Sequence, residues 1–188
     1  NMFNQRVKIK ELLSGSDAKS AVGAEVVVMG WVRTFRNNQF IALNDGSTNN
    51  NLNHLTIKNA TIGLLIQNND GTTVNLKNTQ IYNSTNYGIL AQTAKIKGEN
   101  IVINDAGLAG LACSYGGDYS FTHCTFNNNW SSSNQVAVSI SNYLTGAIPE
   151  VKDLTATTFN NCIIYGSYSN EMILNQKTGA AFEYQFNN

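Results

Sequence analysis

The stretch Asn59-Ala-Thr-Ile62 decides the fold of this chain, because it returns along the sequence. Each copy starts with a polar residue, passes through two variable positions and ends on a large apolar residue. The copies follow one another at about 20 residues, apart from a longer last interval, and such a period is typical of repeat architectures. The further copies are Asn78-Thr-Gln-Ile81, Asn100-Ile-Val-Ile103, His123-Cys-Thr-Phe126 and Asn161-Cys-Ile-Ile164.

Apolar and polar residues alternate through each copy, and a second apolar run such as Gly88-Ile-Leu-Ala91 follows it. Alternation with period two predicts short strands with one buried face. Two or three such strands per repeat predict an all-β fold, a right-handed parallel β-helix of about five coils. Equivalent residues should then stack about 4.8 Å apart, so that the Asn residues share one corner. One buried column is expected to contain Ile62, Ile81, Ile103, Phe126 and Ile164.

Composition limits the function classes. The chain has 188 residues, of which 42% are hydrophobic and 13% charged, and its formal net charge is zero. It can bury a core, and this charge balance argues against a basic nucleic-acid binder overall and against an acidic disordered chain. No apolar run is long enough for a membrane helix, and no signal peptide opens the sequence, which leaves the localisation undetermined. We expect no cofactor and no metal site.

Residues 1–52 do not follow the repeat. The pattern of 7–13 predicts a short amphipathic helix, while 25–34 and 39–44 predict two strands of a hairpin. The first coil of a β-helix exposes apolar side chains and strand edges unless something covers it. We therefore expect the helix and hairpin to cap the repeats of 53–188.

Three phrases of this first segment carry a resemblance: Arg6-Val-Lys-Ile-Lys-Glu-Leu-Leu13, Gly30-Trp-Val-Arg33 and Phe40-Ile-Ala-Leu-Asn-Asp-Gly-Ser47. Together they resemble the start of bacterial asparaginyl-tRNA synthetase, where the OB-fold anticodon-binding domain begins. The later barrel strands and the three class II catalytic motifs of that family are absent after Leu52. The resemblance therefore implies a truncated OB fold, with no ATP or amino-acid site and no aminoacylation.

The same resemblance implies an RNA-binding role for Phe35, Arg36 and Phe40, which lie where the family meets anticodon bases. An aromatic residue on an OB-type sheet can stack on a base. Half a barrel, however, forms no groove. Packing is therefore the favoured role of these residues, and tRNA is not a favoured partner.

Residues 53–188 contain the phrases Gly107-Leu-Ala-Gly-Leu-Ala-Cys-Ser-Tyr-Gly-Gly117 and Phe121-Thr-His-Cys-Thr-Phe-Asn-Asn-Asn-Trp130. They resemble uncharacterised bacterial surface or secreted proteins with right-handed parallel β-helix repeats and, more loosely, pectate-lyase-like proteins. This resemblance implies a fold rather than an activity. Because two families meet near residue 52, we interpret the chain as a fusion or chimera, of natural, accidental or engineered origin.

Charged side chains are scattered over the expected coils. Lys77 and Glu99 should form a surface ion pair of little energetic value. Asp105 and Asp118 remain as a conceivable acid pair for glycoside cleavage, which needs two carboxyl groups facing one bond. His123 stands in the Asn column and is expected to make a structural hydrogen bond. The outward column beside the Asn corner is expected to hold Lys58, Lys77, Glu99, Thr122 and Asn160.

Two cysteines, Cys124 and Cys162, are expected in one inward column of adjacent coils. We expect both to be reduced and buried, because a disulfide needs Cβ atoms about 3.8 Å apart, which is closer than stacked coils lie.

A long insertion, Ser141–Asp153, is the best candidate for binding, since long loops of a solenoid often carry function. Tyr143 in this insertion, together with Tyr115 and Trp130, could stack on sugars or could pack on coil corners. The sequence thus predicts a non-catalytic structural or carbohydrate-interaction solenoid. An RNA-binding OB module with a solenoid extension and a polysaccharide lyase or hydrolase remain the alternatives. Carbohydrate, or a second copy joined end to end at the C-terminal coil, is the expected partner.

Overall fold

The computed structural model divides the chain into two compact units, Asn1–Thr48 and Asn49–Asn188. In the first unit it describes only the backbone of four short strands. The described residues contain no helix that is long and apolar enough to cross a membrane. In the second unit the structure describes residues 50–67, 72–131, 134–146 and 150–188.

The first unit contains two strand pairs. Strand β1 (Arg6–Val7) runs parallel to β2 (Val27–Val28), and β3 (Trp31–Arg36) pairs antiparallel with β4 (Phe40–Asn44). The predicted hairpin is therefore present, but its first strand is Trp31–Arg36 rather than 25–34, since Val27–Val28 pairs with β1. The prediction that a helix begins at Val7 is wrong, because this β-branched residue pairs as a strand. The rest of that helix, and with it the capping role, falls outside the described residues.

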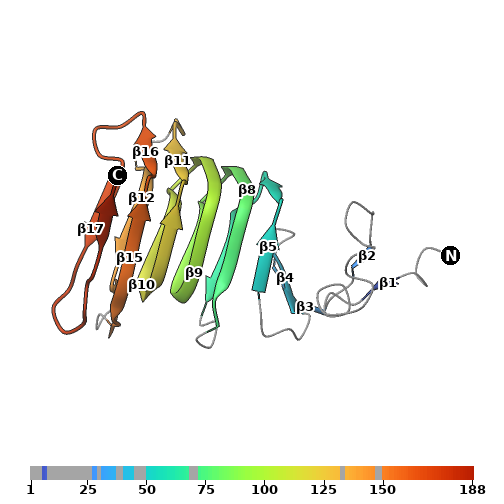
Figure 1. Ribbon diagram of the computed structural model, residues 1–188, viewed down its shortest axis with the longest axis horizontal. Coiled ribbons are helices and arrows are strands. Elements are labelled where there is room, and N and C mark those ends of the chain that lie inside the picture. The colour runs from blue at the N-terminus through green and yellow to red at the C-terminus, as the bar shows by residue number, and fades with distance from the viewer. Residues whose placement is uncertain are drawn as a thin grey trace. The chain divides into compact units, whose positions relative to one another are not determined.

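The second unit is a parallel β-solenoid of about five turns, as the repeats predicted (Figure 1). Each turn crosses three faces, which we name A, B and C in chain order. Strands β8 (Val74–Ser84), β9 (Tyr87–Ala106) and β10 (Ala109–Thr122) bend round corners and contribute to more than one face. The first rung begins at Asn50, within the segment that the synthetase resemblance covers.

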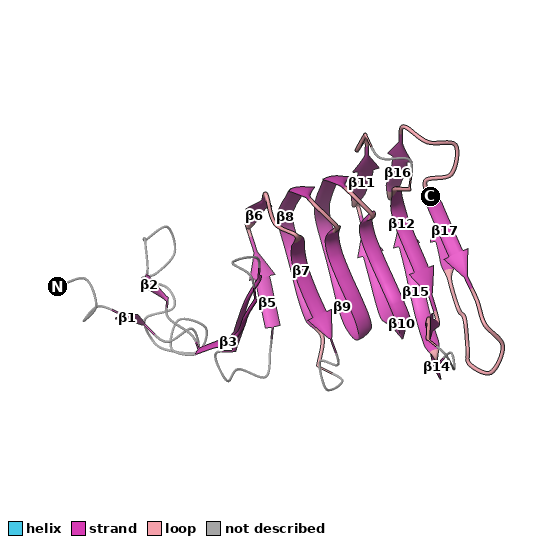
Figure 2. Cartoon of the chain, turned by 180° about the vertical axis from the view of Figure 1, so that it is seen from behind, coloured by secondary structure: helices cyan, strands magenta, loops and turns pink. Residues whose placement is uncertain are grey.

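The remaining parallel strands each belong to one face, and each pairs with a strand of a neighbouring coil (Figure 2). Face A adds β5 (Asn50–Asn53), β15 (Leu154–Asn160) and β18 (Gln185–Asn187); face B adds β6 (Thr56–Lys58), β11 (Thr125–Asn128) and β16 (Ile163–Gly166); face C adds β7 (Ile62–Gln67), β12 (Val136–Ser141) and β17 (Met172–Asn175). A short antiparallel hairpin of β13 (Tyr143–Leu144) and β14 (Glu150–Val151) protrudes after β12.

A corner between faces A and B carries the repeated polar residue in the left-handed backbone conformation that Asn tolerates. The amide of Asn100 donates to Asn78 Oδ1 at 2.8 Å, and Asn78 donates to Asn53 Oδ1 at 2.9 Å. The predicted Asn corner is thus confirmed from the second coil onward. Its members, with φ between 48° and 55°, are His54, Asn78, Asn100, His123 and Asn161.

The first coil corrects the predicted register. Ile57 pairs with Ile81, whereas Ile62 pairs with Tyr87 on face C. Asn59, also at positive φ, belongs to the next corner, between faces B and C. The two corners look alike in sequence, because each has a polar residue three positions before an isoleucine.

The same correction removes Lys58 from the predicted outward column. Lys58 pairs with Tyr82, and it is Asn53 that pairs with Lys77. The Lys77–Glu99 ion pair is confirmed, at 2.6 Å between half-exposed side chains. Hydrogen bonding to Lys77 lowers the pKa of the Glu99 carboxyl.

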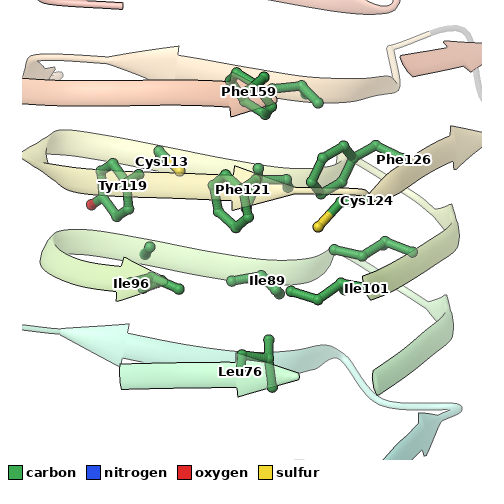
Figure 3. Close-up of a cluster of buried hydrophobic side chains, with 14 of the residues drawn as sticks. Leu76, Ile89, Ile96, Ile101, Cys113, Tyr119, Phe121, Cys124, Phe126 and Phe159 are labelled. Carbon is green, nitrogen blue, oxygen red and sulfur yellow. The ribbon is translucent and has the colours of Figure 1, made fainter. Parts of the chain in front are cut away.

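The core lies between the three faces and is built from columns of equivalent residues (Figure 3). Ile81, Ile103 and Phe126 are fully buried in the predicted column, and Ile164 packs against them half-buried. Burying one such side chain stabilises the fold by roughly 1.5–3 kcal/mol. On face A the rings of Phe121, Phe159 and Phe186 stack with centroids 5.5 and 5.4 Å apart.

Gly98 occupies the same column directly beside Phe121. A Cβ atom at this position would lie 2.6 Å from Phe121 Cδ1 and 2.7 Å from Ile101 Cδ1. The large ring is therefore accommodated because its neighbour in the preceding coil has no side chain. Phe121 thus requires a small residue at the same position of the preceding coil.

Cys124 and Cys162 occupy one corner of adjacent coils, where Ile163 N donates to the Cys124 carbonyl at 2.9 Å. Both thiols are free, as predicted, but only Cys124 is buried, since Cys162 is half-buried. The hydrogen bond between the thiols raises the pKa of Cys124 and lowers that of Cys162. The partial exposure of Cys162 corrects the prediction that both are buried.

Replacing Ile103 with Asp should prevent folding, because it places an unpaired charge in a fully buried column. Val102→Asp is the matched control, since Val102 is the preceding residue of β9 and its side chain is 41% exposed. Thermal unfolding followed by circular dichroism should show a folded Val102→Asp variant and no transition for Ile103→Asp. Equal melting temperatures for both variants would contradict the assigned faces.

The Gly98→Ala variant should be destabilised by about 1–3 kcal/mol, because the new methyl group overpacks the column against Phe121. Shortening the neighbour in Phe121→Leu should relieve the clash. The double variant should therefore lose less stability than the sum of the two single variants, as measured by urea unfolding. Additive losses would show that the two residues do not share one space.

Candidate functional site

The corner between faces C and A lengthens from the second coil to the fourth. In the second coil it consists of Thr93 alone, and in the third it gains a residue, which shifts the register between Ser114 and Gly117. Gly117 has φ of 129° and a Cβ there would collide with the Tyr119 ring, so the position requires glycine. In the fourth coil the corner expands into the insertion that was predicted to bind a ligand.

The insertion is anchored at both ends. Asn142 is fully buried, and its side-chain oxygen accepts a hydrogen bond from Lys177 N at 2.8 Å while its amide donates to Lys177 O at 2.9 Å. At the other end, Asp153 O accepts from Gly117 N at 2.9 Å, and Asp153 Oδ1 accepts from Ala181 N at 2.8 Å. These bonds tie the two ends of the insertion to the third and fifth coils.

A groove of about 640 Å³ lies between this insertion and face A. Lys95 and Asp118 form an ion pair of 3.2 Å at its edge, with both side chains about two-fifths exposed. The hydroxyl of Thr155 donates to Gly117 O at 3.2 Å. Residues lining the groove are Thr93, Ala94, Lys95, Gly117, Asp118, Val151, Lys152, Asp153, Thr155, Gly179 and Ala180.

Two of the predicted carbohydrate-binding residues lie at this corner. The hydroxyl of Tyr115 donates to Glu150 Oε2 at 2.6 Å, and this bond raises the pKa of Tyr115. Lys152 Nζ lies 5.1 Å from the centre of the Tyr115 ring, and Lys177 Nζ lies 4.8 Å from that of Tyr143. One face of each ring is thus covered by a lysine, and both tyrosines are half-buried.

The third predicted residue, Trp130, is not part of this corner. It follows β11 at the corner between faces B and C, half-buried beside Gly107. The structure also keeps Asp105 and Asp118 on different faces. Asp105 ends the face B part of β9 and accepts a hydrogen bond from Asn129 N, whereas Asp118 pairs with Lys95.

The residues predicted to bind RNA lie in the first unit, where the backbone pairing places Arg36 opposite Phe40 and Phe35 opposite Ile41. His123 has the predicted structural bond, 3.3 Å from its Nε2 to Asn161 Nδ2. Among the residues that the structure describes, no three His, Cys, Asp or Glu side chains lie together as a metal site would require.

Sequence reasoning missed the Lys95–Asp118 pair and the anchor Asn142. The ion pair had a signal, because its members are separated by nearly the same interval as Lys77 and Glu99. For Asn142 the sequence contained no signal beyond the position of this residue near the start of the insertion.

Comparisons with known proteins concern the first unit. No family model and no solved structure matches the chain. It is 55% identical over 47 residues to asparagine–tRNA ligase of Cytophaga hutchinsonii, which covers 23% of this chain and 10% of that protein. It is 49% identical over 48 residues to asparagine–tRNA ligase of Geobacter sulfurreducens, covering 24% and 10%. The chain thus spans about a tenth of these relatives, and its similarity to them is confined to a short N-terminal fragment beside a β-solenoid.

Proposed function

We propose that this protein is a non-catalytic, carbohydrate-binding β-solenoid, and that a neutral oligosaccharide binds in the groove beside the insertion. The groove itself carries the proposal. Its volume of about 640 Å³ lies within the range of small-molecule sites, roughly 300–1,000 Å³. It is shallow and open to solvent, and Val151, Lys152 and Asp153 of the insertion line part of it, at a corner of the kind where solenoids often bind ligands.

The chemistry of the lining suits sugar hydroxyl groups, which both donate and accept hydrogen bonds. Thr93 and Thr155 already donate to backbone carbonyls, so their oxygens remain as acceptors. Lysines and aspartates balance one another across the groove, which favours an uncharged ligand over an acidic one. Tyr115 and Tyr143, half-buried at the same corner, supply aromatic rings of the kind that stack on the C–H face of a sugar.

Binding is favoured over bond cleavage because each aspartate of the groove already has a structural partner. Asp118 pairs with Lys95, and Asp153 accepts a hydrogen bond from Ala181 N. A glycosidase needs two carboxyl groups free to face one bond, one of them protonated at neutral pH. For the first unit we propose no aminoacylation, since the similarity to the ligases covers about a tenth of their length.

Calorimetric titration with cello-, xylo-, manno- and chito-oligosaccharides tests this function. At least one of these neutral ligands should bind, and Asp118→Asn should weaken that binding about tenfold, because it removes a charge-assisted hydrogen-bond acceptor from the groove. Glu99→Gln is the matched control, since it breaks the other outward lysine–carboxylate pair of face A, away from the groove. No heat with any of the four ligands, or an equal loss in both variants, would contradict the proposal.

A further inference from the structure

We infer that the outward surface of face B is a second binding platform, for an extended, neutral polysaccharide lying along the stack of coils. This inference rests on the proposed carbohydrate-binding function but concerns a different face from the groove. We name the surface the amide–tyrosine face; it comprises Tyr82, Val102, Asn104, Asn127, Ile163 and Tyr165.

The strand register arranges these residues in two straight columns. Tyr82 pairs with Asn104, Asn104 with Asn127, and Asn127 with Tyr165. Successive members of a column lie about 4.8 Å apart, so the two tyrosines stand about 14 Å from each other, with the amides between them. Each rung advances by a distance close to the length of one sugar unit in an extended chain, so hydroxyl groups of successive sugars can meet successive rungs.

The two central amides are held in place yet keep bonding capacity. Asn127 Nδ2 donates to Asn104 Oδ1 at 2.6 Å, and Asn129 Nδ2 donates to Asn127 Oδ1 at 2.9 Å. Asn104 Nδ2 donates in turn to Asp105 Oδ2 at 3.2 Å. A primary amide has two N–H donors and two acceptor lone pairs. Asn104 and Asn127 therefore each retain one donor and one acceptor, as a sugar hydroxyl requires.

The apolar part of the surface is exposed in the same place. The exposed fractions are 41% for Val102, 59% for Ile163 and 51% for Tyr165. A tyrosine presents an apolar ring with a polar tip, which suits the C–H face and the hydroxyl rim of a sugar. Water-exposed apolar side chains beside ordered amides also give a reason for a partner to bind here rather than elsewhere.

Charge selects the class of polymer. Within the two outward columns of face B, the residues described from the second coil onward carry no charge, and Lys58 stands alone in the first coil. Face A differs, since its outward residues include Lys77, Glu99 and the Lys95–Asp118 pair. An acidic polymer would find no cation to pair with on the amide–tyrosine face. A neutral polymer that binds there displaces no water from charged side chains of the face.

Depletion of the protein by insoluble microcrystalline cellulose and insoluble chitin tests the inference. At least one polymer should remove the protein from solution, and raising NaCl to high concentration should not release it, because no ion pair is involved. Tyr82→Ala and Tyr165→Ala should each lower the ratio of bound to free protein roughly two- to tenfold, and the double variant more. Tyr184→Ala is the matched control, since Tyr184 is 48% exposed but lies between β17 and β18, off face B.

The outcomes separate this inference from the groove. Asp118→Asn should leave retention on the polymer unchanged, and both tyrosine variants should leave oligosaccharide binding in the groove unchanged. Retention that depends on the tyrosines would support the platform even if no oligosaccharide binds in the groove. No depletion by either polymer, depletion unaffected in a folded Tyr82→Ala/Tyr165→Ala variant, or release by salt would overturn it.

Discussion

Stacking of equivalent residues in successive parallel coils is the constraint on which the rest of this structure depends. Because neighbouring strands lie about 4.8 Å apart, each inward side chain has its counterparts in the adjacent coils as its nearest neighbours. A column must therefore fill its space jointly. Phe121 fits because Gly98 lies beside it, and Gly88 lies where a side chain would collide with Ile103. The interior thus permits little independent change in any single coil.

Because packing constrains the inward residues, residues that bind a ligand must lie at outward positions or at the corners. The corner between faces C and A grows from Thr93 in the second coil to the whole insertion in the fourth, and the register shifts at the corner while the pairing is regular again from Asp118 to Thr122. The buried amide of Asn142 forms hydrogen bonds with the Lys177 backbone, which hold the start of the insertion against the fifth coil. On face B the outward residues follow the same stacking rule, so the amides of Asn104 and Asn127 form a regular row.

Sequence reasoning predicted the parts of the fold that repeat. Alternating residues predicted the strands, and the recurring Asn predicted a corner of left-handed residues, which the structure confirms from Asn78 onward. The register of the first coil was not predictable by inspection, since His54 and Asn59 precede isoleucines at the same distance. Only the pairing of Ile57 with Ile81 separates the two.

The candidate site was predicted less well than the fold, for a physical reason. Tyr143 belongs to the insertion and Tyr115 lies at the same corner, whereas Trp130 lies at another corner, which the sequence did not indicate. A loop outside the repeat has no counterpart in other coils, so stacking says nothing about its course. Its position depends on single contacts, such as those of Asn142 and Asp153, that carry no periodic signal.

Cross-linking of cysteine pairs across the first two coils tests the stacking register most directly. Thr56 pairs with Gln80 in the structure, so cysteines at these positions would be stacked neighbours about 4.8 Å apart, which a short bifunctional thiol reagent such as dibromobimane can bridge although a direct disulfide needs closer Cβ atoms. In a Cys162→Ala background, Thr56→Cys/Gln80→Cys should be cross-linked by this reagent, as read by intact mass, while Thr61→Cys/Gln80→Cys should not. Cross-linking of the Thr61 pair instead would place Asn59 beside Asn78 and contradict the register on which the stacked columns are built.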